Sequence, residues 1–141
     1  MANLVKQYKN DPFTGHLSTP ITTSLLTRLI LSNLPLYREG LSPILKGLEI
    51  GISHGYFLIG PFTTFGPLRN SAIANFAGLL STFGLICILV MGLVIYGNVS
   101  FQNSNLNDKS EWNKLTFGFL IGGFGGAGFA FSLLNYVTNY F

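Results

Sequence analysis

The chain has 141 residues, of which 48% are apolar and only 9% are charged, about a third of the charge density of an ordinary soluble domain. With 17 Gly and 13 Phe, this composition argues against a water-soluble fold and predicts a small all-α integral membrane protein with one domain, residues 1–141. The net charge of +3 comes from scattered residues, which argues against a nucleic-acid surface. A single cysteine, Cys87, excludes a disulfide within the chain.

Residues 1–41 predict a polar N-terminal region. Its first half contains Asp11-Pro12, Gly15 and Pro20, which indicate an extended, turn-rich stretch. Apolar residues then recur at helical spacing until Pro35: Leu25, Leu26, Leu29 and Ile30. They predict a short helix on the membrane surface with Arg28 toward water, and a helix that packs on a partner subunit explains the pattern equally well. The region lacks the apolar core of a secretory signal and the Arg and Ser enrichment of a transit peptide.

The first membrane span is expected near residues 43–60. Ser42 followed by Pro43 is typical of a helix N-cap and first helical position. Pro61 is expected to end the helix. This span would contain Lys46, Glu49 and His54, and ionisable residues inside a bilayer need a partner or a function.

Two further spans follow from uncharged segments. Residues 72–96 lie in a run of 38 residues without formal charge between Arg69 and Asp108, and they are long enough to cross a bilayer. Residues 115–141 form another uncharged segment of 27 residues. Aromatic side chains near both of its ends predict interfacial belts: Trp112, Phe117, Tyr136, Tyr140 and Phe141. We expect a polar loop between them, over residues 97–114.

The distribution of basic residues predicts the orientation of the chain. Seven of the eight lie in the N-terminal region, at the start of the first span or in the second loop: Lys6, Lys9, Arg28, Arg38, Lys46, Lys109 and Lys114. The loop between the first two spans has only Arg69, and the C-terminus has none. Because cytoplasmic loops are enriched in Lys and Arg, the N-terminus is expected on the cytoplasm-like side and the C-terminus across the membrane.

His54 is the first candidate ligand. An imidazole within a bilayer needs a partner, which is either a cofactor metal or a backbone carbonyl of a neighbouring helix. Tetrahedral zinc and bis-histidine haem need more ligands than the segment provides, because the other histidine, His16, lies in the polar N-terminal region. A cofactor with one axial protein ligand, such as the magnesium of a chlorophyll, fits better.

Glu49 is the second candidate, because a carboxylate oxygen is a suitable ligand for magnesium. An ion pair with Lys46, three residues earlier, is an equally good explanation, and both can hold together. Glu49 and His54 are five residues apart, which places them about 140° apart around a helix and about 7.5 Å apart along it. This offset favours two separate single-ligand sites over one shared metal site.

The third span contains a glycine stripe. Gly118, Gly122 and Gly126 form overlapping small-xxx-small spacings that allow another backbone, or a flat macrocycle, to approach closely. Helix packing is the more economical explanation of the two. The glycines do not match a nucleotide-binding fingerprint. The chain also lacks a nucleophile elbow, a zinc-protease motif and a Walker sequence, so we expect no enzyme.

Four sequence stretches resemble the subunit XI family of photosystem I. They are NDPFTGHLSTPI at residues 10–21, NLPLYREGLSP at 33–43, ILKGLEIGISHGYFLIGPF at 44–62 and GPLRNS at 66–71. The resemblance covers nearly the whole chain and is most specific through the first span. It implies a three-helix thylakoid subunit, without catalysis, that binds chlorophyll a and carotenoid such as β-carotene at the rim of the core. The motif GLEIGISHGY carries the family's axial magnesium ligands onto Glu49 and His54.

The resemblance also implies partners. These are core subunits A and B, small membrane subunits such as I and M, thylakoid lipid and antenna proteins. Cyanobacterial members form the contact of a homotrimer through a region after the third helix. Because the sequence has no residues after that helix, we expect a monomeric complex in the thylakoid of a plastid or a cyanobacterium, with the N-terminus stromal and the C-terminus lumenal.

One hypothesis from another class remains. A small transporter or channel component would use Lys46, Glu49 and His54 to line a polar path. This hypothesis requires the three side chains to converge, and the angular offset between Glu49 and His54 opposes that.

Overall fold

Four helices make up the described part of the computed structural model, which comprises residue 21 and residues 24–102 and 105–140. They are α1 (Leu25–Asn33), α2 (Pro43–Phe65), α3 (Ala74–Ser100) and α4 (Leu106–Tyr140). The all-α prediction is confirmed. The N-terminal stretch that is predicted to be extended, with Lys6, Lys9 and His16, lies outside the described residues.

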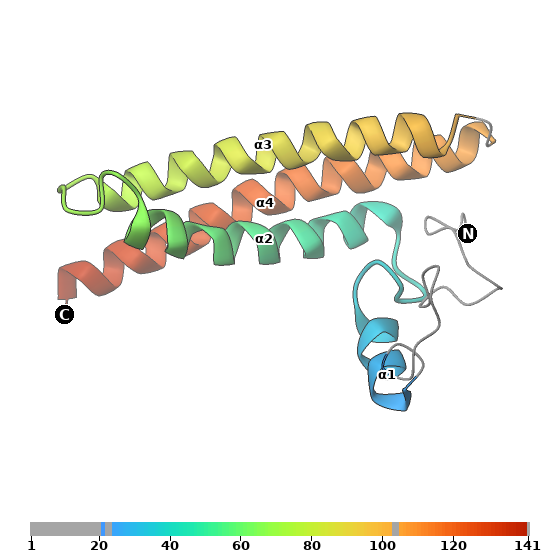
Figure 1. Cartoon of the computed structure of the whole chain (residues 1–141), viewed down its shortest axis with the longest axis horizontal. Coiled ribbons are helices and arrows are strands. Elements are labelled where there is room, and N and C mark those ends of the chain that lie inside the picture. Colours follow the sequence, from blue (N-terminus) through green and yellow to red (C-terminus); the bar gives the residue numbers. More distant parts are fainter. Residues whose placement is uncertain (1–20, 22–23, 103–104, 141) are drawn as a thin grey trace.

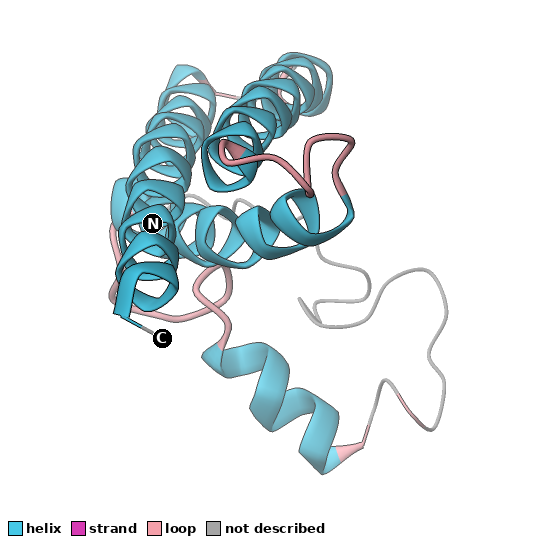
Figure 2. Ribbon diagram, turned by 90° about the vertical axis from the view of Figure 1, so that its left-hand side faces the viewer, coloured by secondary structure: helices cyan, strands magenta, loops and turns pink. Residues whose placement is uncertain are grey.

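The three long helices pack side by side, and α1 stands apart at one end (Figures 1 and 2). α2 and α4 run parallel to each other, while α3 runs antiparallel to both (Figure 1). The most extensive contact joins α2 to α4. Within the described part of the chain, α1 contacts none of the other three helices, and all of its residues remain at least partly exposed.

α2 begins as predicted but continues past Pro61. Ser42 is its N-cap and Pro43 its first residue, although the Ser42 side chain makes no capping hydrogen bond. The predicted end at residue 60 is wrong, because the helix reaches Phe65. Proline lacks an N–H and costs one helical hydrogen bond. The helical turn after Pro61 nevertheless packs on α3, where Thr63 contacts Gly78, and this contact offsets the lost hydrogen bond.

The predicted loop over residues 97–114 is also wrong, because most of it is helical. α3 extends to Ser100 and α4 begins at Leu106, nine residues before the predicted start of the third span. Asp108 lies in the first turn of α4, where its negative charge complements the helix dipole. Trp112 is buried, so packing against α3 also stabilises this extension.

Two helices are long and apolar enough to cross a membrane, over Ala74–Ser100 and Leu106–Val137. α2 does not meet the same criterion, since polar residues such as Lys46, Glu49 and His54 lower its hydropathy. Its role as a third span stays a prediction.

The order of the helices gathers the basic residues at one end. Arg28 belongs to α1 and Arg38 to the loop after it. Lys46 lies in the first turn of α2, and Lys109 and Lys114 lie in the first three turns of α4. These segments share one end of the bundle (Figure 1). Arg69 lies in the α2–α3 connection at the opposite end. The charge separation read from the sequence is therefore also a separation in space.

Candidate functional site

α2 carries the two candidate ligands beside the face that packs on α4, with His54 at the edge of that face against Phe119 of α4 and Glu49 farther round the helix. That face consists of small buried residues, Gly47, Gly51 and Gly55. Glu49 is half-buried and His54 is exposed at the surface of the bundle. The helix therefore has one side that fixes its position and other sides that present polar groups outward.

The orientation of His54 is set by a hydrogen bond to its own helix. Its Nδ1 lies 2.8 Å from the carbonyl oxygen of Ile50. Because a carbonyl only accepts, Nδ1 donates, and in the neutral ring Nε2 carries an unprotonated lone pair. Phe119 of α4 contacts the imidazole edge-on, with ring centroids 5.4 Å apart. The alternative that His54 bonds to a carbonyl of a neighbouring helix is wrong, since the carbonyl belongs to α2.

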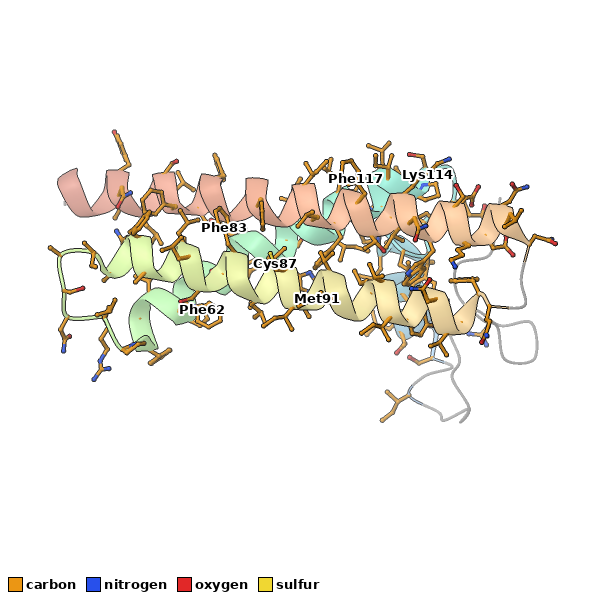
Figure 3. The ribbon with its side chains drawn as sticks, turned by 90° about the horizontal axis from the view of Figure 1, so that it is seen from above. Phe62, Phe83, Cys87, Met91, Lys114 and Phe117 are labelled. Carbon is orange, nitrogen blue, oxygen red and sulfur yellow. The ribbon has the colours of Figure 1, made fainter. Side chains whose placement is uncertain are left out.

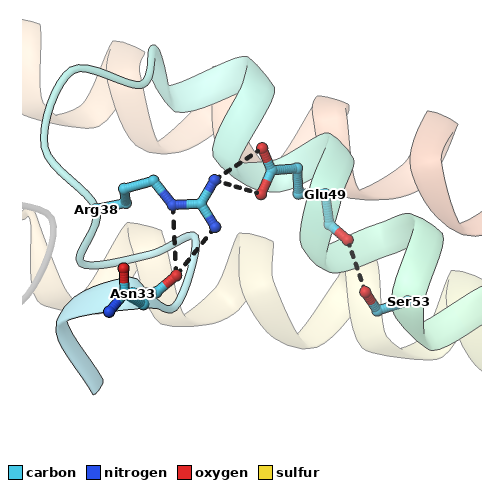
Figure 4. Close-up of polar contacts among 4 residues, drawn as sticks. All are labelled: Asn33, Arg38, Glu49 and Ser53. Carbon is cyan, nitrogen blue, oxygen red and sulfur yellow. Dashed lines mark hydrogen bonds and ion pairs between the residues drawn. The ribbon is translucent and has the colours of Figure 1, made fainter. Parts of the chain in front are cut away.

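Glu49 forms an ion pair with Arg38 (Figure 4). Arg38 Nη1 lies 3.3 Å from Oε2 and 3.4 Å from Oε1 of Glu49. The same guanidinium donates from Nη2 and Nε to the carbonyl oxygen of Asn33, at 3.0 and 3.3 Å. Ser53 donates to the backbone oxygen of Glu49 at 3.1 Å, so it leaves the carboxylate untouched.

The predicted ion pair between Glu49 and Lys46 is wrong. Lys46 Nζ instead donates to the carbonyl oxygen of Leu36 at 2.9 Å. Long side chains on a helix lean toward its N-terminus, which directs Lys46 to the loop before α2. The same loop folds back and brings Arg38 to Glu49, a contact between residues that helical spacing alone cannot relate.

The candidate groups do not form a shared metal site. Within the described part of the chain, no cluster of three or more His, Cys, Asp and Glu side chains can hold a metal ion. Glu49 and His54 instead bond to different partners, Arg38 and Ile50. Each therefore offers at most one ligand to a cofactor whose metal already has other ligands.

The glycine stripe of α4 packs on a second stripe that we did not single out in the sequence. A Cβ atom at Gly118, Gly122 or Gly126 would collide with a backbone carbonyl oxygen of α2, and one at Gly47, Gly51 or Gly55 with a backbone carbonyl oxygen of α4. Helix packing is therefore confirmed as the use of the α4 glycines. The spacing of four residues in GLEIGISHG was the signal for the α2 stripe.

The aromatic residues divide into two groups. Phe117 and Tyr136 are exposed, and Phe117 projects from the outer side of α4 (Figure 3), as expected for interfacial rings. Trp112 is only 6% exposed, and its Nε1 donates to the carbonyl oxygen of Leu93 at 2.8 Å. Its assignment to an interfacial belt is corrected to helix packing, because Gly97 leaves room for the indole. The Tyr140 side chain and Phe141 lie outside the described residues.

Two apolar grooves run along the outer edge of the α2–α4 contact and share Tyr56. One, of about 330 Å³, is lined by Leu48, Ile52, Tyr56, Ile121, Gly122, Gly125, Gly126 and Phe129. The other, of about 450 Å³, is lined by Tyr56, Phe57, Ile59, Gly60, Ala130, Leu133, Leu134 and Val137. Tyr56 and Phe129 approach within 6.3 Å between ring centroids. By contrast, Phe83 packs on Phe124 between α3 and α4 (Figure 3).

Comparison with known proteins gives one family. The model of the family described as Photosystem I reaction centre subunit XI matches residues 4–139. The chain is 58% identical to Photosystem I reaction center subunit XI of Emiliania huxleyi, over 98% of each chain. It is 58% identical to the protein of that name from Cyanidioschyzon merolae, over 96% of this chain and 98% of the relative.

A more distant relative agrees. The chain is 52% identical to Photosystem I reaction center subunit XI of Trichodesmium erythraeum, over 95% of this chain and 87% of the relative. The resemblance noted in the sequence is thereby confirmed. The chain belongs to the photosystem I reaction centre subunit XI family.

Proposed function

We propose that this chain binds chlorophyll a through His54 and Glu49, carries carotenoid beside Tyr56, and thereby passes excitation energy at the periphery of photosystem I. The observation that carries the proposal is the exposed imidazole of His54, whose Nδ1 is bonded to Ile50 while Nε2 remains available. A chlorophyll magnesium is held by four pyrrole nitrogens and accepts one axial ligand, so a single protein atom is sufficient.

Family membership fixes the wider setting. The chain is a structural subunit of photosystem I, it is not an enzyme, and it has other photosystem I subunits as partners. Its membrane is the thylakoid.

His54 fits the role of a metal ligand in two respects. A histidine ligand usually donates its second ring N–H to an oxygen acceptor, which fixes the ring and strengthens the ligand. The Ile50 carbonyl supplies that acceptor. Phe119 then restricts rotation of the imidazole from the α4 side.

Glu49 fits a second site of the same kind. A charged carboxylate within an apolar layer needs an opposite charge to offset its lost hydration, and Arg38 supplies one. The Glu49 side chain is 39% exposed, so a ligand can reach it from outside the bundle. The residues present therefore match the donor chemistry that the family implies.

For carotenoid, the two grooves that share Tyr56 are the best candidates. They are apolar and elongated along α2 and α4, and the rings of Tyr56 and Phe129 border them. A polyene such as β-carotene binds by van der Waals contact along its length, which such surfaces provide.

We further propose that α2 is the third membrane span and that the basic end of the bundle faces the stroma. All three long helices are aligned (Figure 1), so a bilayer that surrounds α3 and α4 also surrounds α2. With Arg28, Arg38, Lys46, Lys109 and Lys114 at one end, the positive-inside rule gives a stromal N-terminus and a lumenal C-terminus.

Two apolar surfaces of the chain are available for contact with neighbouring subunits. The apolar face of α1 and the outer face of α3 are exposed in the isolated chain. We assign them to core subunits A and B, small subunits such as I and M, antenna proteins and lipid.

A transport path through Lys46, Glu49 and His54 is less well supported. The three side chains bond to Leu36, Arg38 and Ile50, respectively. They point to separate partners instead of converging, so they do not line one path.

The proposal can be tested by replacing each ligand in the intact complex. His54→Leu should remove one chlorophyll, or shift its absorption, while the chain still assembles. Ser53→Ala, which removes a neighbouring hydroxyl bonded to the backbone, is the matched control. Pigment counts by chromatography and low-temperature absorption spectra are the measurements. An unchanged count and spectrum for His54→Leu would overturn ligation by this residue.

A further inference from the structure

We propose that Arg38 is a positioning residue for the Glu49 ligand: it fixes the plane of the carboxylate and balances its charge. This inference rests on the proposed function, because it requires Glu49 to ligate chlorophyll magnesium. The observations that support it do not involve His54 or the grooves: they are the position of Arg38 in the loop between α1 and α2 and the contacts of its guanidinium.

The geometry of the ion pair is specific. Arg38 Nη1 is nearly equidistant from the two carboxylate oxygens, 3.4 Å from Oε1 and 3.3 Å from Oε2. It therefore lies at the edge that the two oxygens share. Each oxygen has a further lone pair on its outer side, so this contact orients the carboxylate without using all of its ligand capacity.

Arg38 is itself anchored at a second point. Its Nη2 and Nε both donate to the carbonyl oxygen of Asn33, the last residue of α1. Carbonyls in the last turn of a helix lack partners within the helix and carry partial negative charge. The planar guanidinium thus binds one acceptor with one side and the carboxylate with another, which the single ammonium of a lysine cannot reproduce.

The balance of charge at Glu49 also points to Arg38 as the positioning residue. A carboxylate that ligates a neutral macrocycle leaves a net negative charge in an apolar layer, which is costly without a nearby cation. Among the described residues, Arg38 is the cation bound to the Glu49 carboxylate. Lys46, although closer in sequence, donates to the Leu36 carbonyl. The positive charge at this site therefore comes from the loop before α2.

Lys46 also provides a matched control. Both Lys46 and Arg38 fasten the loop to its surroundings, through Leu36 and through Asn33, but only Arg38 touches Glu49. Lys46→Gln therefore loosens the same loop and leaves the carboxylate pair intact. Arg38→Gln removes both functions, and Arg38→Lys keeps the charge but not the double contact.

The experiment compares Arg38→Gln, Arg38→Lys, Lys46→Gln and Glu49→Leu in purified photosystem I, by chlorophyll count and by low-temperature absorption and circular dichroism. Glu49→Leu should lose or shift one chlorophyll band. Arg38→Gln should shift that same band, with a smaller shift for Arg38→Lys and none for Lys46→Gln. In the double variant with Glu49→Leu, Arg38→Gln should add nothing.

The outcomes separate the two proposals. If Glu49→Leu alters a band and Arg38→Gln does not, Arg38 has no positioning role and Glu49 remains a ligand. If Lys46→Gln causes the same shift as Arg38→Gln, the effect comes from the loop, and the positioning role is wrong. If Glu49→Leu alters nothing, ligation by Glu49 fails and the role of Arg38 fails with it. Should Arg38→Gln not accumulate, the partial shift expected for Arg38→Lys decides.

Discussion

α4 packs against its two neighbours in different ways. Its contact with α2 is made by backbones: a Cβ atom at Gly122 would collide with the carbonyl oxygen of Leu48, and one at Gly51 with that of Phe119. Its contact with α3 is made by side chains. Trp112 lies over Gly97, and the rings of Phe83 and Phe124 stack with centroids 4.5 Å apart.

The difference shows that the position of α2 relative to α4 is fixed more tightly than that of α3 relative to α4. Two glycine stripes allow only one close register, because any shift brings larger side chains between the backbones. α2 carries Glu49 and His54, so this register sets where both groups lie relative to the rest of the chain. The α3 contact tolerates more adjustment, since side chains can change rotamer while a backbone in a helix cannot.

The largest effect is expected for Gly122→Leu, which tests the backbone contact between α4 and α2. A Cβ at this position already collides with the α2 backbone, so α2 and α4 must separate. Overpacking usually costs about 1–3 kcal/mol, and a backbone contact has less room to relax. We expect the chain to be largely absent from purified photosystem I, as measured by immunoblotting.

Gly128→Leu is the control for that experiment. A Cβ at Gly128 meets nothing within 4 Å, and leucine forms helices better than glycine. This variant should accumulate as the original chain does. Equal losses for the two variants would mean that glycine as such, and not close packing at Gly122, is required.

Trp112→Ala should have the next largest effect, on the α3 side. Removing a buried tryptophan leaves a cavity and typically costs about 3–5 kcal/mol. Here it also removes the hydrogen bond to the Leu93 carbonyl. The temperature at which the chain dissociates from the complex should fall clearly. Trp112→Phe keeps a ring but not the donor and should lower it less, by the equivalent of about 1 kcal/mol. An equal fall for both would contradict the packing role.

Asn75→Ala should have a smaller effect. The Asn75 amide donates to the side-chain oxygen of Asn135 at 2.9 Å and links α3 to α4. Hydrogen bonds between helices in membranes contribute about 0.6 kcal/mol on average. Thermal dissociation of the complex should therefore occur a little earlier than in the original chain, and Ser81→Ala, a change at an exposed position of α3, should leave it unchanged.

The smallest difference in stability is expected between variants of Thr63 and Thr82, two threonines that both contact Gly78. Thr63 Oγ1 is buried without a hydrogen-bond partner among the described residues, whereas Thr82 Oγ1 donates to the Gly78 carbonyl at 2.8 Å. Thr63→Val should be neutral or slightly stabilising, because it removes an unpaired polar atom. Thr82→Val should cost about 1 kcal/mol. The dissociation temperatures of the two variants test this order, and the reverse order would contradict it.

Much of the candidate site could be predicted from residue types. Glu49 and His54 stand out because ionisable groups are rare in apolar helices and need partners there. The structure assigns the partners differently from the sequence, however. Helical spacing related Glu49 to Lys46, while the actual cation, Arg38, is 11 residues away and reaches Glu49 through the fold of a loop. Spacing rules apply within one helix and do not extend to such contacts.

By itself, the sequence determined the four helices, the starts of α1 and α2, the separation of basic residues and the packing role of Gly118, Gly122 and Gly126. These features depend on local periodicity, capping and charge, which each segment carries alone. Only the tertiary structure decided that α2 continues beyond Pro61, that α4 begins at Leu106, that Trp112 is buried and that Arg38 binds Glu49. Each of these depends on a contact between distant segments, and such a contact overrides the local preference of the chain.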